Sequence, residues 1–293
     1  MIGSNIKRNV TAEQEGLPVK QILSQDLGFS RREITRLNAE RGIFLNGETC
    51  RLSQPVKNGD VLEVQLKGKD QARGVLLEGK PTILFEDEHM VIVNKPAGMP
   101  AHASKEHPDD DMGSLLERYY EGHVCPRPVG RLDKGVSGIM IYAKSRKAAA
   151  LLSSQRAVLK LHKEYLAVAR GHFREKQGTL EYALKRDAGK HNRKVAEDGQ
   201  VCITDYKVEK EYPGRSLVRI SIRTGRTHQI RAGMAYFKHV LIGDRLYGDD
   251  TKEIRRPALH CADMELCHPF TGEQMHIHCD LPDDMNLLLR EKN

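Results

Sequence analysis

The chain of 293 residues contains no tryptophan, and only 5% of its residues are aromatic. It has no uncharged apolar run close to the roughly 18 residues that a membrane-spanning helix requires. Its first ten residues, MIGSNIKRNV, also lack the apolar stretch of a signal peptide. These absences predict a cytoplasmic protein with a modest core and no membrane association.

Cysteine is scarce as well. The six cysteines, Cys50, Cys125, Cys202, Cys261, Cys267 and Cys279, are scattered without any close CxxC pair. This spacing is unlike a secreted disulfide framework and predicts reduced, mostly buried thiols. Cysteines and histidines between residues 260 and 279 raise the alternative of a zinc site. Structural zinc sites pair their ligands at short spacings that this region lacks, so no metal is expected.

Charge gives a broad indication of the partner. The chain carries 47 Lys and Arg against 40 Asp and Glu, a net charge of +7. Such an excess attracts polyanions and favours nucleic acid near the surface. An ordinary basic enzyme would have the same balance, and charge alone separates RNA neither from DNA nor from acidic lipid. Nothing indicates an obligate protein partner, so a monomer is the default expectation.

The N-terminal part has the pattern of a small separate domain. Apolar residues over 17–40 follow the spacing of two short helices that are broken at Gly28, with Ser30 as the N-cap of the second. After Gly42 the period changes to two, and Asn46-Gly47 forms a tight turn between extended runs. We predict a domain over 12–68, followed by a linker over 69–80 whose Gly, Lys and Gln content is typical of flexible segments.

The second of these helices carries three cations, Arg31, Arg32 and Arg36, which either contact phosphates or form an ordinary solvated face. The sequence SRREITRLNAERGIFLNGE at 30–48, closing with VKNGDVLEV at 56–64, resembles the alpha-L type RNA-binding domain over about residues 12–68. This resemblance favours RNA as the ligand.

The rest of the chain, 81–293, is rich in short apolar and β-branched runs punctuated by Gly and Pro, with one clear helical stretch over 145–159. The pattern predicts an α+β domain with a large, mainly antiparallel mixed sheet and flanking helices around a central cleft. The segment 185–199 is expected to be an exposed basic loop between strands. Its Lys185, Arg186 and Arg193 either follow an RNA backbone or are simply solvated.

One segment, VGRLDKGVSGIMIYAKS at 129–145, places Asp133 in a glycine-rich turn before a buried strand. Loops at strand ends often carry catalytic groups, although a surface salt bridge would explain an isolated RLD equally well. Further motifs follow in order, VIVNKPAGMPAH at 91–102, KEYLAVARG at 163–171, the long run 223–250 and HCADMELCHPFTGE at 260–273. Together they resemble the RluA-type pseudouridine synthases over about 200 residues.

The resemblance implies an RNA isomerase. Asp133 matches the family's catalytic aspartate, Tyr165 its aromatic residue beside the target base, and Arg231 the cation paired with the aspartate. Arg131 matches an arginine used in RNA and base rearrangement. Pseudouridine formation breaks a glycosidic bond and rejoins the base through carbon, so no cofactor is expected. The uridine must be flipped into a pocket, for which we expect Leu132, Ile139 and Ile230 as walls.

Further polar residues of these motifs are expected to support RNA binding: Arg226, Thr227, His228, Gln229 and Lys95. Within this set, His228 is expected as an orienting or structural group more than as a general base, and Lys95 as either structural or phosphate-facing. The family pattern is HRLD followed by TSG, and this chain departs from it at Gly130 and Val136. Ribosomal RNA is the favoured substrate, with transfer RNA open. Two alternatives stay open, a non-catalytic RNA-binding or ribosome assembly factor, and a hydrolase that uses Asp133 with His228 and releases free uracil.

Overall fold

We describe the fold from a computed structural model of the chain. The described residues are 5–27, 29, 31–65, 79–104, 109–187, 189 and 192–290. Contacts between residues divide the chain into two compact units, Met1–Arg73 and Gly74–Asn293. Each unit is described by itself. No helix in the described part of the chain combines the length and the apolar character that crossing a bilayer requires.

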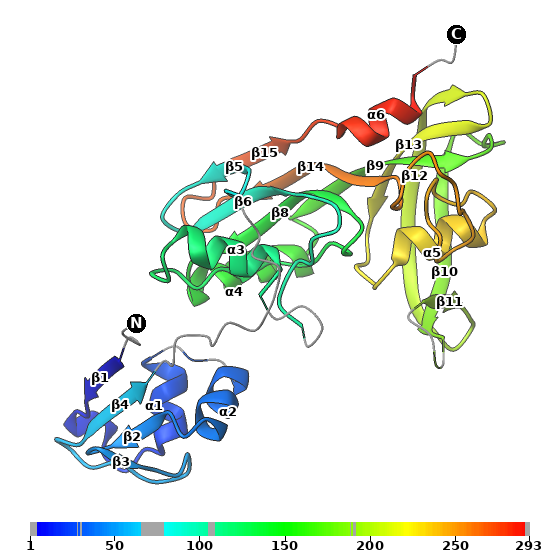
Figure 1. Ribbon diagram of the computed structural model, residues 1–293. Helices are drawn as coiled ribbons and strands as arrows, with labels where there is room; N and C mark the ends of the chain where they lie inside the picture. Colours follow the sequence, from blue (N-terminus) through cyan, green and yellow to red (C-terminus); the bar gives the residue numbers. More distant parts are fainter. Residues whose placement is uncertain are drawn as a thin grey trace. The chain divides into compact units, whose positions relative to one another are not determined.

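The first unit packs two helices, α1 (Val19–Gln25) and α2 (Arg31–Ala39), on a small sheet (Figure 1). Among the described residues the sheet has the strand order β1-β4-β2-β3, and a 3-10 turn at Ala12–Gln14 follows the first strand. The strands are β1 (Asn5–Asn9), β2 (Ile43–Leu45), β3 (Glu48–Thr49) and β4 (Val61–Gln65).

The predicted helices, the turn at Asn46-Gly47 and the later strand of this unit are confirmed. Strand β1 is an addition, because it lies before residue 12 and pairs antiparallel with β4. The core consists of the periodic apolar side chains, among them Ile22, Leu23, Leu37 and Leu62, which are almost fully buried. The cap expected at Ser30 and most of the linker expected over 69–80 lie outside the described residues.

The second unit contains a large sheet with the described strand order β11-β10-β12-β13-β9-β14-β8-β6-β5, to which β15 adds beside β14 and β7 beside β8. Only β14 and β8 run parallel; the other described pairs are antiparallel. The strands are β5 (Ile83–Glu86), β6 (Met90–Lys95), β7 (Arg127–Pro128), β8 (Ser137–Ala143), β9 (His162–Arg170), β10 (Gln177–Arg186), β11 (Arg193–Val195), β12 (Gln200–Tyr212), β13 (Arg215–Ile222), β14 (Leu259–Cys267) and β15 (Gln274–His278).

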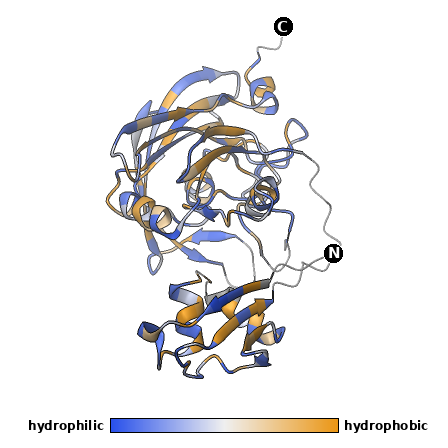
Figure 2. Ribbon diagram, turned by 90° about the vertical axis from the view of Figure 1, so that its left-hand side faces the viewer, coloured by the Kyte–Doolittle hydropathy of each residue, from blue (hydrophilic) through white to orange (hydrophobic). Residues whose placement is uncertain are grey.

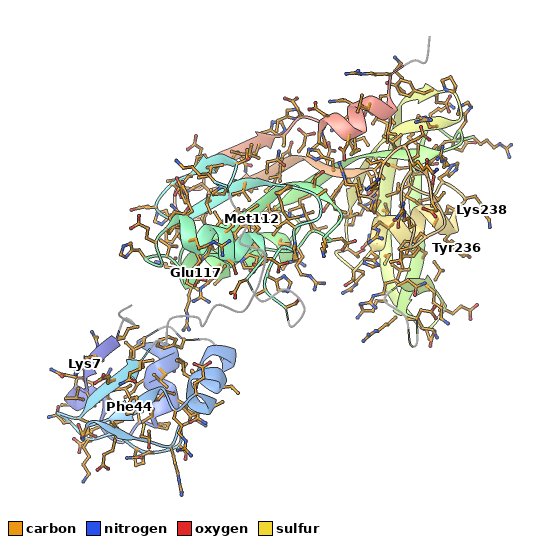
Figure 3. All side chains as sticks on the ribbon, viewed as in Figure 1. Lys7, Phe44, Met112, Glu117, Tyr236 and Lys238 are labelled. Carbon is orange, nitrogen blue, oxygen red and sulfur yellow. The ribbon has the colours of Figure 1, made fainter. Side chains whose placement is uncertain are left out.

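Four helices flank this sheet in the described chain, α3 (Met112–Tyr119), α4 (Arg146–Ala157), α5 (Gln229–Tyr236) and α6 (Asp283–Leu288). Helix α4 packs on β7 and β8, and α5 packs on β10 and β11. On α3, Met112 is buried on the sheet side while Glu117 lies on the other side of the helix (Figure 3). The expected α+β class and the helix predicted over 145–159 are both confirmed.

The centre of the sheet is the most apolar part of the second unit (Figure 2). Every residue of β8 is buried, as its uninterrupted apolar run predicts. Gly138 in β8 has φ +111°, and a Cβ at this position would overlap the backbone of Cys261 on β14. Glycine therefore allows the close approach of these two central strands, which fixes the loop before β8 beside the start of β14.

Candidate active site

A pocket of about 220 Å³ opens where several loops meet at the ends of the central strands. Its walls come from the loop 129–136 before β8, the segment 222–231 that leads into α5, strand β9 and the C-terminal end of α4. Leu132 and Ile230 line it as expected, but the prediction for Ile139 was wrong. Ile139 is fully buried within β8 and does not reach the pocket.

Asp133 lies in this pocket with one oxygen held and the other open. Its Oδ2 accepts a hydrogen bond from Nη1 of Arg231 at 3.2 Å. Its Oδ1 accepts no hydrogen bond from any residue in the described ranges, and the side chain is 25% exposed. The backbone N–H of Val136 donates to the carbonyl of Asp133 at 3.0 Å, which closes the turn without a side-chain hydroxyl.

Arg231 is positioned by a second carboxylate. Its Nε and Nη2 donate to the two oxygens of Asp244 at 2.7 and 2.9 Å, and Asp244 is 1% exposed. Hydrogen bonds and charge attraction from Asp244, with a smaller contribution from Asp133, outweigh desolvation and raise the pKa of Arg231. The guanidinium is thus a fixed permanent cation beside Asp133. Sequence analysis missed Asp244, although it lies in the quoted run 223–250.

His228 lies at the start of α5 in the left-handed conformation, with φ 57°. Its Nε2 is 3.7 Å from Asp133 Oδ2, and its Nδ1 is 3.1 Å from the hydroxyl of Tyr247. That hydroxyl accepts from the backbone N–H of Arg193, which favours donation of its own proton to Nδ1. Burial lowers the pKa of His228, so it is mostly neutral at pH 7. This geometry fits the orienting role expected for it.

Tyr165 on β9 lines the pocket and is 5% exposed. It shares a face of the sheet with its register partners Ile220 and Cys261, opposite to the face of Glu164. Burial raises the pKa of Tyr165 well above its usual value, so the phenol stays protonated at neutral pH. Its hydroxyl makes no hydrogen bond with a described residue and is available to a ligand.

Two predicted RNA-binding residues have internal roles instead. Lys95 is fully buried, and its Nζ donates to the carbonyls of Pro96 and Met99 at 2.8 Å and lies 3.5 Å from that of Lys134. Gln229 is 3% exposed. Its side-chain oxygen accepts hydrogen bonds from the segment before α5, and its side-chain nitrogen donates to β12. Neither side chain is free for RNA, and both residues hold loops of the pocket in place. Lys95 thus has the structural one of its two expected roles, whereas the RNA contact expected for Gln229 was wrong.

The remaining predicted cations of the second unit lie around the pocket. The exposed Arg131 donates from Nη2 to Thr227 at 3.1 Å, and both line the pocket together with Arg226. A neighbouring hollow of about 310 Å³ is lined by Lys185, Arg186 and Arg193 on β10 and β11 and by Arg226 and Thr227.

The expected basic loop is thus largely a β-hairpin, and residues 188 and 190–191 at its tip lie outside the description. Lys185 is paired with Asp198 at 2.7 Å. The side chains of Arg31, Arg32 and Arg36 also lie outside the description.

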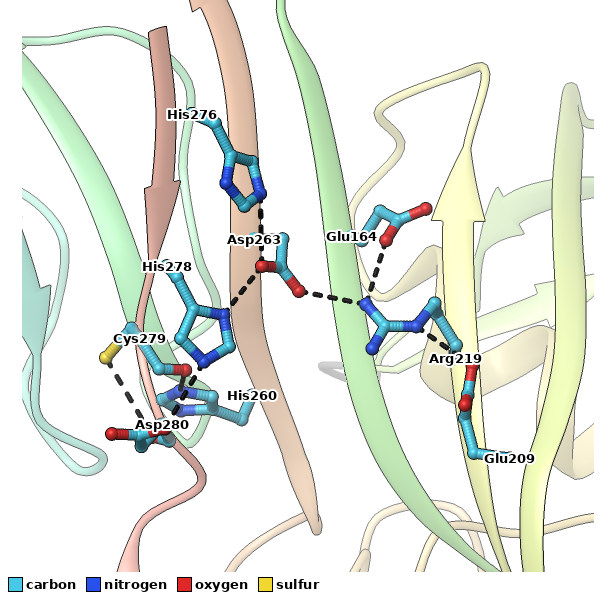
Figure 4. Close-up of polar contacts among 9 residues, drawn as sticks. All are labelled: Glu164, Glu209, Arg219, His260, Asp263, His276, His278, Cys279 and Asp280. Carbon is cyan, nitrogen blue, oxygen red and sulfur yellow. Dashed lines mark hydrogen bonds and ion pairs between the residues drawn. The ribbon is translucent and has the colours of Figure 1, made fainter.

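The histidines that raised the zinc alternative bind other groups (Figure 4). His276 and His278 contact Asp263 at 3.3 and 2.7 Å, and the other oxygen of Asp263 binds Arg219 at 2.9 Å. Arg219 also pairs with Glu164 and Glu209. This set, which we name the Arg219 network, lies on the face of the sheet that carries Glu164, opposite to Tyr165.

Comparison with known proteins shows which family the chain belongs to. A family model described as RNA pseudouridylate synthase matches residues 89–236, about half of the chain. A Bacillus subtilis protein named uncharacterized RNA pseudouridine synthase YhcT is 34% identical over 98% of this chain and 97% of its own length. The chain belongs to the RNA pseudouridylate synthase family. Members of this family are isomerases that convert uridine to pseudouridine in RNA.

Three further similarities extend this assignment. Ribosomal large subunit pseudouridine synthase D of Xylella fastidiosa is 32% identical over 89% of this chain and 84% of its own length. A model of the N-terminal domain of RluD ribosomal pseudouridine synthases matches residues 6–62. The solved structure of human RNA pseudouridylate synthase domain containing 4 has the same fold, with a TM-score of 0.59 at 23% identity over 71% of this chain and 91% of its own.

Proposed function

We propose that this family member isomerises specific uridines of ribosomal RNA, with Asp133 as the catalytic acid. The observation that carries the proposal is that the two carboxylate oxygens of Asp133 have different surroundings. Arg231 holds Oδ2, while Oδ1 accepts no hydrogen bond from a described residue, and Asp133 and Tyr165 line the same pocket. A carboxylate oriented by a fixed cation, with one oxygen open, is arranged to attack an electrophilic carbon.

The pocket suits a single extruded base. Its volume of about 220 Å³ is below the about 300 to 1,000 Å³ of pockets for drug-sized ligands. A uridine stacked in RNA does not expose its glycosidic bond, so the nucleotide must be flipped, at a cost of a few kcal/mol. Tyr165 then offers a flat ring for stacking and a protonated hydroxyl as a donor, and Leu132 and Ile230 shield the detached base from water.

The reaction conserves every atom of the nucleotide. The bond between the ribose and nitrogen N1 breaks, the base turns, and a bond from carbon C5 to the ribose replaces it while a proton moves from C5 to N1. Asp133 starts the reaction, Arg231 holds its orientation, and Asp244 fixes Arg231. His228, neutral and hydrogen-bonded to Tyr247, positions the carboxylate from the other side.

Recognition of the RNA is assigned to the cations around the pocket. Arg131, Arg226 and Thr227 lie at its wall, and Arg186 and Arg193 line the neighbouring hollow. Each cation that neutralises a phosphate releases a counterion and adds affinity. We assign residues 12–68 to an RNA-binding domain, 69–80 to a linker and 81–293 to the catalytic domain. Ribosomal RNA is favoured because relatives named for the large ribosomal subunit match both parts of the chain.

The test is an assay of purified full-length protein on ribosomal RNA and on transfer RNA that both lack modifications. Pseudouridine is quantified site by site, and free uracil is measured in the same samples. New pseudouridine at one or a few sites of ribosomal RNA, without uracil release, is the expected result. Conversion of transfer RNA alone overturns the substrate assignment, and uracil release indicates the hydrolase. RNA binding without either product indicates a non-catalytic factor.

A further inference from the structure

Arg156, in the last turn of α4, reaches the pocket between two loops that both carry glycine. A Cβ at Gly130 would lie 3.4 Å from its Nη1, and a Cβ at Gly225 would lie 3.4 Å from its Nη2. The guanidinium is therefore flanked by the backbones of the loop that carries Asp133 and of the segment that leads into α5. A side chain longer than a methyl group at Gly130 would need the space that the guanidinium occupies.

This arginine has no partner of its own. Arg156 is exposed, lines the pocket, and makes no hydrogen bond or ion pair with any residue of the described chain. Arg219, Arg223 and Arg231, by contrast, are each bound to carboxylates. A guanidinium is always charged and offers five donors in a planar fork that matches phosphate. Its position between two loop backbones restricts that fork to the pocket mouth.

We infer that Arg156 is a substrate-binding residue that holds a phosphate of the flipped nucleotide at the pocket mouth. The inference rests on the proposed function, since it requires an RNA nucleotide in this pocket. Gly130 is the reason that the guanidinium fits there, because it presents no side chain. One departure of this chain from the family pattern thus makes room for a cation from another element of the fold.

The neighbouring groups support an anion at this point. Lys163 lines the same wall, and burial, with a smaller contribution from Arg156, lowers its pKa and therefore disfavours its charge. Arg226 lines the same pocket and has no side-chain partner in the described chain. A phosphate that binds beside Arg156 gains charge-assisted hydrogen bonds and meets no carboxylate that is already bound to this arginine.

The first experiment compares Arg156→Ala and Arg156→Lys with the wild type in the full-length protein. Arg156→Ala is expected to raise KM and the dissociation constant for RNA about 10-fold and to change kcat less than about 3-fold. The slope of log affinity against log salt should fall by about one phosphate contact. Arg156→Lys should restore part of the affinity. Lys147→Ala, which removes a charge from the same helix outside the pocket, should change none of these values.

The second experiment tests whether Arg156 and Gly130 act together. Gly130→His is made in the wild type and in Arg156→Ala. The strain of a side chain at φ +87° is common to both, whereas displacement of the guanidinium occurs only in the wild type. We expect the affinity loss from Gly130→His to be several-fold smaller in the Arg156→Ala background. Thermal unfolding checks that all variants are folded.

Each negative result has one meaning. An active wild type in which Arg156→Ala leaves KM, RNA affinity and salt dependence unchanged overturns the inference and leaves the proposed function intact. The inference is also overturned if the loss of RNA affinity in the double variant equals the product of the losses in Arg156→Ala and Gly130→His. A fall in kcat with unchanged KM assigns Arg156 to chemistry instead of phosphate binding. An inactive wild type that still loses RNA affinity on Arg156→Ala contradicts the isomerase and not the phosphate contact.

Discussion

Two arginines of the large sheet unit each connect several carboxylates, yet only one of them faces a pocket. Arg231 bridges Asp133 and Asp244 and is 8% exposed. Arg219 bridges Glu164, Glu209 and Asp263 on the opposite face, with about a third of its side chain exposed (Figure 4). In both cases hydrogen bonds to carboxylates raise the pKa of the arginine against the opposing effect of desolvation.

The difference lies in what is left unsatisfied. Both oxygens of Asp263 are occupied, one by Arg219 and the other by His278. Asp133 keeps one oxygen without a partner among the described residues, in a pocket beside an unpartnered tyrosine hydroxyl. Charge and a raised pKa alone therefore do not identify a site. An open acceptor beside a fixed cation does, and the predictions below compare the two networks on that point.

The largest contrast is expected between Asp133→Asn and Asp263→Asn. Asp133→Asn removes the attacking oxygen and should lower kcat more than about 10³-fold, as loss of a nucleophile does. Asp263→Asn weakens contacts that only hold strands together, so its kcat should stay within about 3-fold of wild type. Steady-state rates on ribosomal RNA give both values. Equal losses in the two variants would show that the open oxygen has no special role.

A smaller contrast is expected between Arg231→Lys and Arg219→Lys. Lysine keeps the charge but not the planar fork that reaches Asp133 and Asp244 together. Arg231→Lys should lower kcat about 100-fold, comparable with the loss of one oriented donor at an active site. Arg219 lies on the opposite face of the sheet, away from the pocket, so Arg219→Lys should leave kcat unchanged. The comparison fails if Arg219→Lys costs as much activity as Arg231→Lys.

A smaller difference of the same kind is expected between two buried tyrosines, one in the pocket and one outside it. The hydroxyl of Tyr142 donates to the carbonyl of Ala101 at 2.6 Å, whereas that of Tyr165 has no partner in the described chain. Tyr165→Phe should lower kcat about 10-fold through one lost hydrogen bond to the substrate, with stability unchanged. Tyr142→Phe should lower stability by about 1 to 2 kcal/mol and spare kcat. Steady-state kinetics and urea unfolding are measured on both variants. A loss of kcat in Tyr142→Phe, or a loss of stability alone in Tyr165→Phe, would contradict this contrast.

The smallest effect concerns two histidines and acid stability. Burial lowers the pKa of His260 to about 4. Below its unfolded pKa of about 6.5 the unfolded chain takes up a proton that the folded chain refuses, so stability falls as the pH falls. Between pH 7.5 and 5 this costs about 2 kcal/mol, which His260→Asn should remove.

His278 provides the control with the opposite sign. Its hydrogen bond to Asp263 raises its pKa, so its contribution is present below pH 6.5 and lost as the pH rises through the folded pKa. His278→Asn should therefore steepen the acid loss slightly, because the ring is largely exposed. Urea unfolding at pH 7.5 and pH 5 measures these changes in stability. If His260→Asn loses as much stability between the two pH values as the wild type, His260 is not the cause of the loss.

Local pattern was sufficient for much of the fold. The uninterrupted apolar run of β8, the helix predicted over 145–159 and the turn at Asn46-Gly47 depend on neighbours in the sequence, and each is present in the structure. Strand β1 was missed because its residues, NIKRN, are mostly polar, and only pairing with β4 across more than 50 residues makes them a strand. The register of β1 is set by its pairing with β4 in the folded domain, and no pattern in the nearby sequence predicts it.

The same limit applies to the site. Motif resemblance supplied Asp133, Tyr165 and Arg231, and the structure brings all three to one pocket. The sequence left Lys95 as either structural or phosphate-facing, because the choice depends on three carbonyls that only the folded chain brings to its ammonium group. Asp244 and Arg156 were missed because their roles depend on distances to residues far away in the sequence.

The most direct test of the central claim is a pseudouridine map of ribosomal RNA from cells that lack this gene. The wild type, Asp133→Ala and Asp263→Ala are returned separately at equal protein levels. We predict that one or a few sites are lost with the gene and return with the wild type and with Asp263→Ala, but not with Asp133→Ala. Return of those sites with Asp133→Ala would contradict the assignment of Asp133 as the catalytic acid.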